Sequence, residues 1–451
     1  MSEHLRLHEL GIQFTNQTSP VLSGVNLSVG ADECHCIVGP TGSGKSSLLL
    51  AASGLLPSGA CHGTVQVTSR PGAVFQNPHT QVLCDHVGPE TAFALENGGV
   101  QPEAMQDMVT QALAEADLPV PTHTPTNRLS MGRQYRLVLA GALVTTPDLL
   151  LLDEPCAQLD PQGCQAVARI IERVRARGGG VLLCEHEPAA LAEQITHWWR
   201  LDNGHLIPSE PFRKTDESTT LPGSPHGHTT SPDTHALLHI HDLHLTLGEK
   251  PIFSGLDLTI HPGQAVHVEG VNGSGKSTLT RVISGFLSPD SGTVSLCDTP
   301  VSPAALRGCV GLVLQNPVSQ LFEDTVGQEL SFAPRRKGMA AIPEKVARIA
   351  DLLGITHLLE NAPFLLSYGQ QRLVALGACL TQEPELLILD DPFAGLDLKA
   401  RSRVRNLLHQ ERVHRGMAVL ITGHNPSSPR RFADFYTREL RLEGGRLAPV
   451  A

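Results

Sequence analysis

Hydrophobic residues in this chain fall into short runs, and several runs end at a sharply defined polar group. The runs at 35–39 and 266–270 lead into glycine-rich loops, and each loop is followed by a helix pattern. Two further runs, "LLLLDEP" at 149–155 and "LLILDDP" at 386–392, end in paired acids and a proline. Short apolar runs bounded by turn residues are typical of buried strands. The pattern therefore predicts strands that deliver glycine loops and carboxylates to their C-terminal ends.

Nearly every such feature occurs twice in the same order, which indicates tandem duplication of a whole domain. We predict domains at 1–206 and 237–451, each closed by a strand, a tight turn and a strand. The matched segments are "GPTGSGKSS" (39–47) with "GVNGSGKST" (270–278), "VFQNP" (74–78) with "VLQNP" (313–317), "LSMGR" (129–133) with "LSYGQ" (366–370), and "LLCEHEP" (182–188) with "LITGHNP" (420–426).

The segment between the repeats, 207–236, is rich in Pro, Ser, Thr and Gly. Such a composition cannot bury enough apolar surface to fold, so we predict a flexible tether. Histidines crowd the tether and the strand after it, and they allow two interpretations: a metal-sensing tail or ordinary solvated side chains. These histidines are His226, His228, His235, His239, His241 and His244.

Composition narrows the classes of function. The chain has 451 residues, which suits two or three domains, with 41% hydrophobic and 18% charged residues, as in a globular protein. A net charge of −11 argues against a surface built to neutralise nucleic acid, which requires clustered Lys and Arg. The densest basic run before the C-terminal helix is "PRRKG" at 334–338.

Membrane spans, leaders and disulfides are not predicted. The richest apolar run, 137–144, is far shorter than the roughly 20 residues needed to cross a bilayer. The first residues lack the basic and apolar regions of a signal peptide, so a cytoplasmic location is expected. Ten scattered cysteines indicate reduced thiols, and Cys34-His35-Cys36 fits the start of an apolar strand better than a metal chelate.

The two glycine loops match G-x-x-x-x-G-K-[ST] in the strand-to-helix context that this motif requires. Their backbone N–H groups would cradle phosphates, the lysines would reach the outer phosphates, and the hydroxyls of Ser46 and Ser277 would ligate Mg²⁺. The predicted nucleotide-binding residues here are Gly39, Pro40, Thr41, Gly42, Ser43, Gly44, Lys45, Ser46 and Ser47, with Gly270, Val271, Asn272, Gly273, Ser274, Gly275, Lys276, Ser277 and Thr278.

The acidic strand ends suit metal-assisted phosphate chemistry. Asp153 and Asp390 would lie in the Mg²⁺ water shell, and the next residues, Glu154 and Asp391, would orient and deprotonate the attacking water. "LSMGR" and "LSYGQ" each place a serine at a helix start, where its hydroxyl would cap the helix and an anion is favoured.

Together with the phosphate loops, these serine segments resemble the LSGGQ signature of the ATP-binding-cassette family. The resemblance covers both repeats and implies an α/β fold: two tandem P-loop nucleotide-binding domains, each with a RecA-like core, a helical subdomain and an antiparallel β subdomain. It implies catalytic roles for Gln76, Gln315, His186 and His424, and metal-site roles for the two glutamines. It also implies that Phe14 stacks on the adenine and that the signature residues Ser130, Gly132, Ser367, Gly369 and Gln370 contact nucleotide.

The stretch after each glutamine, Q-N-P-x-x-Q-[LV]-[LF] followed by V-G-x-E-x-x-F-A, is similar to the ATPase subunits of energy-coupling-factor (ECF) importers for vitamins and metal ions. That similarity implies a transmembrane T component and a separate substrate-binding S component as partners, at the cytoplasmic face of the membrane. Phe93 and Phe332 would either pack within the helical subdomain or contact the partner directly.

In the family, two domains pair head to tail, so each site combines the phosphate loop of one domain with the signature of the other. The first site would join Lys45, Glu154 and His186 to Ser367-Tyr368-Gly369-Gln370, which is close to the family pattern. The second would join Lys276 and Asp391 to Ser130-Met131-Gly132-Arg133, where both halves depart from it. Leu247 also replaces the aromatic expected in place of Phe14. The hypothesis is that the first site hydrolyses ATP and the second turns over slowly or not at all; the rival interpretation is that both sites are active.

Two alternative functions remain open. One is the fused ATPase of a monosaccharide or peptide importer. The other is a soluble twin-cassette ATPase acting on ribosomes or nucleic acid, which we would expect to carry a long charged arm or basic patches that this tether lacks.

Overall fold

The computed structural model describes residues 3–14, 19–57, 59–157, 159–211, 235–248, 250–271, 273–302, 306, 308–423 and 435–450. The chain divides into two compact units, Met1–Asp216 and Glu217–Ala451. Several predictions fall outside the described residues: the roles of Asn272 and His424, and most of the tether with its histidines. The strand before the tether continues to Pro208, slightly past the predicted domain end, and the strand after it begins at Leu238.

The first unit contains a larger sheet with strand order β5-β6-β7-β3-β8-β9 and a smaller antiparallel sheet with order β2-β1-β4. In the larger sheet the pairs from β5 to β8 are parallel, and β9 alone pairs antiparallel. The strands are β1 Glu3–Ile12, β2 Leu22–Gly30, β3 Cys34–Val38, β4 Cys61–Val67, β5 Gly72–Val74, β6 Leu149–Asp153, β7 Gly180–Cys184, β8 His197–Asp202 and β9 His205–Pro208.

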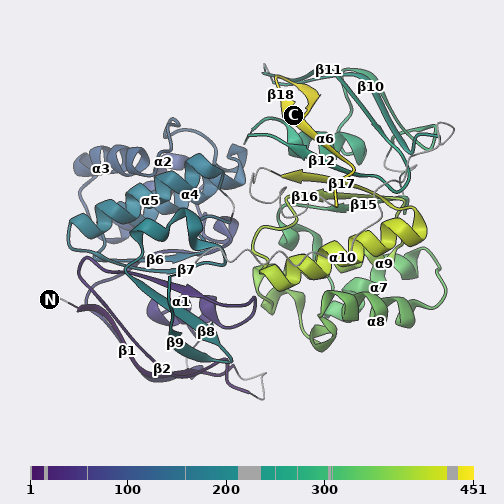
Figure 1. Ribbon diagram of the computed structural model, residues 1–451. Helices are drawn as coiled ribbons and strands as arrows, with labels where there is room; N and C mark the ends of the chain where they lie inside the picture. The colour runs from purple at the N-terminus through teal and green to yellow at the C-terminus, as the bar shows by residue number, and fades with distance from the viewer. Residues whose placement is uncertain are drawn as a thin grey trace. The chain divides into compact units, whose positions relative to one another are not determined.

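Helices cover both faces of this larger sheet. Its α-helices are α1 Lys45–Ala52, α2 Val87–Asn97, α3 Pro102–Glu115, α4 Met131–Leu143 and α5 Pro161–Ala176. Short 3-10 turns are η1 Pro78–Thr80, η2 Thr126–Arg128, η3 Pro188–Ala190 and η4 Ala192–Gln194. Figure 1 shows α1 with β1 and β2 on one side of the larger sheet and α4 and α5 on the other, while α2, α3 and α4 gather into a helical group.

The second unit repeats this plan. Its larger sheet has the order β15-β16-β17-β12-β18-β19, and its antiparallel sheet has the order β11-β10-β13-β14. The strands are β10 Leu238–Leu247, β11 Lys250–Ile260, β12 Ala265–Glu269, β13 Ser291–Leu296, β14 Thr299–Pro300, β15 Val310–Val313, β16 Leu386–Asp390, β17 Ala418–Gly423, β18 Arg438–Glu443 and β19 Arg446–Pro449.

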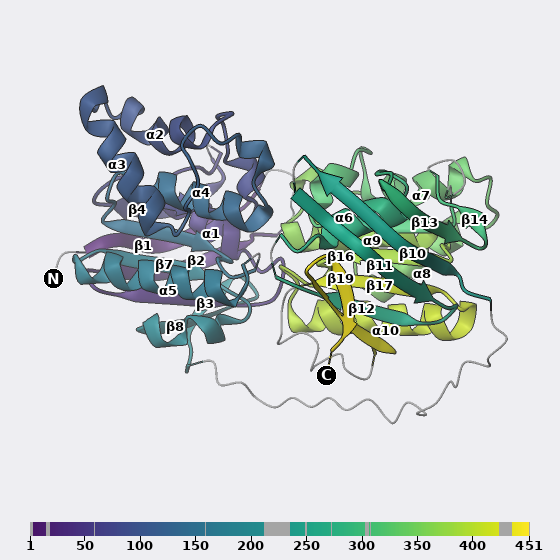
Figure 2. The same ribbon diagram turned by 90° about the horizontal axis from the view of Figure 1, so that it is seen from above.

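The helices of the second unit are arranged in the same way, with α6 on one side of the larger sheet and α9 and α10 on the other (Figure 1); Figure 2 shows the same elements from above. They are α6 Lys276–Ile283, α7 Val326–Arg336, α8 Ile342–Leu353, α9 Tyr368–Thr381 and α10 Leu398–Arg415, with 3-10 turns η5 Pro317–Gln320, η6 Thr356–Leu358 and η7 Pro363–Leu365.

Strand β6 has a leucine at every position before Asp153, with no alternation of polar and apolar residues, because both of its faces are buried. Along β6, Leu149 and Leu151 pack with the antiparallel sheet and α1, whereas Leu150 and Leu152 pack with α4 and α5. A parallel strand covered on both faces must be hydrophobic on both. Because the parallel strands end at one edge of the sheet, the loops after β3, β5, β6 and β7 meet there. That edge brings the predicted site residues together.

No helix in the described ranges is both long enough and apolar enough to cross a membrane.

Candidate functional site

Each glycine loop lies between a central strand and the helix that begins at its lysine. Gly39 to Gly44 link β3 to α1, and the loop before Lys276 links β12 to α6. Gly44 and Gly275 have φ values of 102° and 108°, a region that side-chain-bearing residues rarely adopt. A Cβ on Gly44 would also lie 2.8 Å from Val21 Cγ1, and one on Gly275 would lie 2.9 Å from Ile252 Cγ2. These two glycines are therefore required by backbone shape and by packing.

The loop lysines are held over their own loops. Lys45 Nζ donates to the carbonyls of Gly39 (2.9 Å) and Pro40 (3.0 Å), and Lys276 Nζ donates to those of Gly270 (2.7 Å) and Val271 (3.0 Å). The hydroxyls of Ser43 and Ser274 are buried and have no hydrogen-bond partner among the described residues. Each loop thus presents a cation and an unused hydroxyl, a donor set that fits the phosphates of ATP.

Asp153 ends β6 and hydrogen-bonds the hydroxyl of Ser46. Burial and the neighbouring Glu154 raise the pKa of Asp153, and its Oδ1 atom has no hydrogen-bond partner within the described part of the chain. A buried carboxylate oxygen without a partner, beside a serine hydroxyl, is the kind of oxygen donor pair that Mg²⁺ prefers. The residues present therefore fit the predicted metal site.

Glu154 stands at the centre of a buried polar group in the first unit. Its φ of 49° and its N–H bond to the carbonyl of Cys184 (2.9 Å) fix a left-handed turn directly after the strand. The Gln76 amide donates to its Oε2 over 2.5 Å, and His186 Nε2 lies 2.9 Å from its Oε1. Lys45 Nζ lies 3.5 Å from the same His186 nitrogen. The structure thus brings the predicted loop lysine, glutamine, carboxylate and histidine of the first domain into contact.

The second unit has the same turn but different contacts. Asp391 has a φ of 51° and its N–H donates to the carbonyl of Thr422 over 2.8 Å. The preceding Asp390 accepts a hydrogen bond from the Thr422 hydroxyl (2.5 Å) and one from Ser277. Burial raises the pKa of Asp390, while these two hydrogen bonds oppose the rise. At the position of Thr422 the first unit has Cys184, whose thiol instead faces the carbonyl of Lys45 at 3.7 Å.

The two signature serines differ in their local structure. Ser367 caps α9 in a full capping box, in which its hydroxyl accepts from the Gln370 N–H and the Gln370 amide oxygen accepts from the Ser367 N–H. Ser130 occupies the same position before α4 but makes no such bond, so the prediction that its hydroxyl caps the helix is wrong. The two sequences also differ three residues on, because Gln370 supplies the acceptor that a capping box requires and Arg133 has none, so the box cannot be completed at Ser130.

Comparison with known proteins finds the same duplication. The family model described as ABC transporter matches the chain twice, at residues 22–157 and 253–394. The chain belongs to the ABC transporter family. It therefore consists of two tandem ABC nucleotide-binding domains of an ATPase, which confirms the predicted family and fold.

Relatives agree with this family. An ABC transporter ATP-binding protein of Bifidobacterium longum is 31% identical over 96% of this chain, which spans 64% of that protein. The HMP/thiamine import ATP-binding protein YkoD of Bacillus subtilis is 28% identical over 96% of this chain and 89% of its own length. Among solved structures, cbiO1 of Clostridium perfringens, described as part of the ABC transporter complex cbiONQ, is 29% identical, with a TM-score of 0.43, and covers 47% of this chain and 87% of its own.

The Q-N-P-x-x-Q segment of each ABC domain has a structural role that the sequence analysis missed. Gln81 Oε1 accepts from the Phe75 N–H (2.7 Å) and Gln320 Oε1 accepts from the Leu314 N–H (2.7 Å), so the second glutamine pins the strand end that carries Gln76 or Gln315. The repetition of both glutamines at one spacing was the available signal.

The glutamate of V-G-x-E pins the next loop. Glu90 Oε2 accepts from the N–H groups of Leu83 and Cys84, and Glu329 Oε2 accepts from those of Phe322 and Glu323, all within 2.7 to 2.9 Å. Each pinned loop holds an apolar side chain in solvent, with Leu83 68% and Phe322 57% exposed. Phe332 packs edge-on against Phe322 at 4.7 Å, and Phe93 is 41% exposed.

The residues predicted to contact the adenine, Phe14 and the equivalent Leu247, differ in burial. Phe14 is half-buried against the core of the antiparallel sheet, whereas Leu247 is 43% exposed at the end of β10. Stacking on Phe14 stays a prediction.

One cluster outside the nucleotide loops has metal-ligand composition: Glu33, His35 and His197. Trp199 Nε1–H donates to His35 Nδ1 (3.1 Å), so the ring proton is on Nε2 and points to Glu33 Oε2 at 3.0 Å. A metal at Nε2 would require that proton on Nδ1, where Trp199 already donates. Burial lowers the pKa of His35 to about 4, in keeping with a neutral ring in a satisfied network. Its neighbours Cys34 and Cys36 are buried free thiols.

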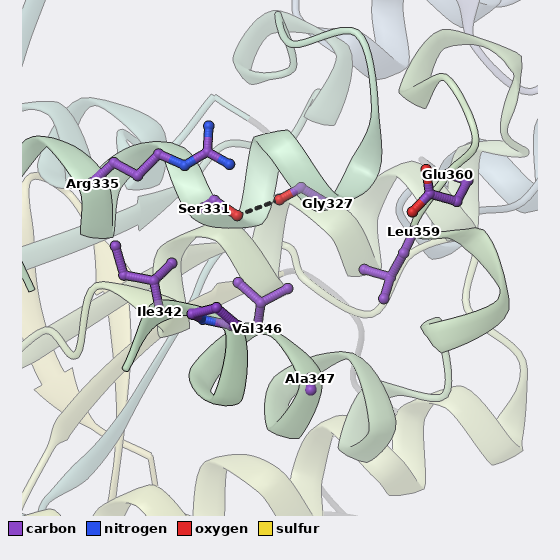
Figure 3. Close-up of a pocket in the computed structure, with 9 residues that line it drawn as sticks. Gly327, Ser331, Arg335, Ile342, Val346, Ala347, Leu359 and Glu360 are labelled. Carbon is purple, nitrogen blue, oxygen red and sulfur yellow. Dashed lines mark hydrogen bonds between the residues drawn. The ribbon is translucent and has the colours of Figure 1, made fainter. Parts of the chain in front are cut away.

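A pocket of about 360 Å³ lies in the helical subdomain of the second ABC domain (Figure 3). Ile342, Val346 and Leu359 form its apolar wall, and Arg335 and Glu360 lie at its two ends. The hydroxyl of Ser331 donates to the carbonyl of Gly327 within α7 and is already satisfied. None of the residues that line this pocket belongs to the predicted nucleotide sites.

Proposed function

We propose that this ABC ATPase is the motor subunit of an ECF-type membrane importer for a vitamin or a metal ion. The Q-N-P-x-x-Q and V-G-x-E segments of both domains support the class, and the import function in the name of YkoD supports a vitamin as cargo. The partners are a transmembrane T component and a small S component that binds the substrate. The protein would act peripherally at the cytoplasmic face of the membrane.

The T component would be gripped through the pinned loops. Both repeats expose a large apolar side chain at the same position of this loop, which makes the position a candidate for binding a partner. Leu83 and Phe322 are each held outward by a loop that a buried glutamate fixes, so little ordering cost remains when a partner binds. An apolar helix of the membrane subunit is the occupant that this surface suits.

The two domains would close head to tail on ATP, and the tether would favour closure within one chain. The first site would combine the Glu154 group with Ser367, Gly369 and Gln370, and the second would combine the Asp391 group with Ser130 and Gly132. Mg²⁺, held by Ser46 and Asp153 in one domain and by Ser277 and Asp390 in the other, with Gln76 and Gln315 nearby, would neutralise charge on the phosphates.

The contact of Glu154 with both Gln76 and His186, together with the shorter side chain of Asp391 at the same turn, is the observation that supports unequal sites. A carboxylate held at 2.5 and 2.9 Å by two partners is positioned to orient and deprotonate a water. Asp391 is one methylene shorter on the same turn and would hold that water out of line. Loss of positioning on this scale costs about 10²-fold in rate. We therefore propose that the first site hydrolyses ATP and the second binds it with slow turnover.

The test compares Glu154→Gln with Asp391→Asn in the complex assembled with its membrane subunits. We expect Glu154→Gln to reduce ATP hydrolysis about 10²-fold or more and Asp391→Asn to change it less than twofold. Equal losses in the two variants would overturn the asymmetry. Affinity purification tests the importer class: recovery of ribosomes or nucleic acid in place of membrane subunits would contradict it.

A further inference from the structure

In the second domain, one buried guanidinium ties the signature helix to both arms of the carboxylate site. Arg372 is 2% exposed. Its Nη1 donates to the carbonyl of Asp391, and its Nη2 donates to the carbonyl of Gln315 over 2.6 Å. The Tyr368 hydroxyl donates to the same Gln315 carbonyl over 2.8 Å and accepts from Arg372 Nη2 over 3.1 Å. We call this set of bonds the Arg372 clamp.

The clamp joins three segments that are distant in sequence. Tyr368 is the first residue of α9, directly after the signature residue Ser367. Gln315 follows β15, and Asp391 follows β16. A displacement of the Gln315 or Asp391 backbone must therefore either move Ser367 or break hydrogen bonds to a buried cation. Breaking them is costly, because an unpaired buried charge destabilises a protein strongly.

The first domain lacks this device. Its signature helix has Met131 in place of Tyr368 and Tyr135 in place of Arg372. Tyr135 is almost completely buried, and its hydroxyl has no hydrogen-bond partner among the residues that the structure describes. The two repeats thus differ where the signature helix meets the carboxylate turn.

We propose that Arg372 and Tyr368 are positioning residues that couple nucleotide binding at the second site to hydrolysis at the first. The inference rests on the proposed head-to-tail pairing, in which Ser367 completes the first site while Gln315 and Asp391 belong to the second. ATP at the second site fixes the backbone at Gln315 and Asp391. Through the hydrogen bonds of the Arg372 clamp, that backbone fixes the start of α9, so Ser367 is held where the first site requires it. A site that hydrolyses slowly would then act as a regulator of its neighbour.

The experiment is a double-mutant cycle on the full chain in its membrane complex, with the rate of ATP hydrolysis at saturating ATP as the readout. Lys276→Ala weakens nucleotide binding at the second site, and Tyr368→Phe removes the hydroxyl bonds with almost no change in volume. Allosteric couplings are commonly worth 5- to 150-fold, so we expect each single variant to slow hydrolysis on the order of tenfold. The double variant should be no slower than Lys276→Ala alone.

Three variants check the assignment. Tyr135→Phe is the matched control in the first domain, because it removes a hydroxyl that makes no hydrogen bond, and it should leave the rate unchanged. Arg372→Lys, which keeps the charge but loses the fork, should behave like Tyr368→Phe, and Arg372→Met should be at least as severe. Thermal unfolding of each variant identifies any loss that comes from instability, and Tyr368→Phe decides the test if the arginine variants unfold.

The outcomes separate this inference from the proposed function. If Lys276→Ala slows hydrolysis and the effect of Tyr368→Phe multiplies with it, the clamp is only structural and the inference is overturned, although the paired sites stand. If Lys276→Ala leaves hydrolysis unchanged, nucleotide at the second site does not affect the first and the inference is overturned, although the paired sites stand.

Discussion

The hydroxyl of Thr422 donates a hydrogen bond of 2.5 Å to Oδ1 of Asp390, the acid that ends β16. In the first domain the residue paired with the equivalent Asp153 is Cys184, and Asp153 Oδ1 has no hydrogen-bond partner in the described ranges. The Oδ1 atom of Asp390 therefore already accepts a hydrogen bond, whereas the Oδ1 atom of Asp153 is available to a metal ion or its water shell. This difference arises from one side chain on the neighbouring strand and not from the acids themselves.

We expect Thr422→Val to lower the free energy of unfolding of the second domain by about 1–3 kcal/mol, because it leaves a buried carboxylate oxygen without its donor. Cys184→Val is the matched change in the first domain, where only a weak thiol contact of 3.7 Å is lost, and it should cost less. Urea unfolding of the full chain measures both. Equal losses would show that the hydroxyl bond contributes nothing beyond packing.

Phe322→Asp and Leu83→Asp should each weaken binding to the membrane subunit, because both place a charge at an exposed apolar tip of a pinned loop. Co-purification from detergent measures the complex. Val413→Asp is the control, since Val413 is also an exposed apolar side chain (56%) but belongs to α10 and not to a pinned loop. If both loop variants retain the partner, the docking surface does not include these loops. The pocket between α7 and α8 would then be the next region to test, with Ala347→Trp.

Most of the fold could be predicted from the sequence because its signals are local. The repeat, the glycine loops and the apolar runs ending in Asp153 and Asp390 fix where parallel strands end, and a parallel sheet places those ends at one edge. The contact between Gln76 and Glu154 follows from the same edge. These features depend on chain order and strand direction, which the sequence carries.

The contacts that distinguish the domains depend on side chains brought together by packing. Nothing near Arg372 in the sequence shows that its guanidinium meets the carbonyls of Gln315 and Asp391, and the partner of Asp390 lies on a neighbouring strand. The incomplete capping box at Ser130 could be predicted from the sequence, because Arg133 stands where the box needs an acceptor.

The first domain should lose stability as the pH falls from about 6.5 towards 4. His35 is buried and its pKa is lowered to about 4, chiefly by burial, whereas an unfolded histidine titrates near 6.5. Between these values the unfolded chain binds the proton and the folded domain does not, so acid favours unfolding. The contribution at pH 5 is about 2 kcal/mol. Denaturant melts at pH 7.5 and 5 should show a shallower pH dependence in His35→Gln than in His205→Gln, an exposed control; identical slopes would refute the assignment.

Gln370 and Arg133 are the third residues of α9 and α4, and exchanging them should exchange which of the two helices has a complete capping box. Gln370→Arg removes the acceptor that completes the capping box at Ser367, which loosens the start of α9 by about 1 kcal/mol. Ser367 would serve the site proposed to hydrolyse ATP. The rate of hydrolysis should therefore fall by a larger factor than the fraction of unfolded protein accounts for.

Arg133→Gln is the reciprocal change at α4. It supplies an acceptor where the box is incomplete, so the first domain should gain a few tenths of a kcal/mol or more of stability. Total hydrolysis should change little, since Ser130 would face the carboxylate of Asp391, whose shorter side chain would still limit that site. Steady-state rates and thermal melts of both variants measure the exchange. A large rise in hydrolysis with Arg133→Gln would mean that the signature, rather than Asp391, limits the second site.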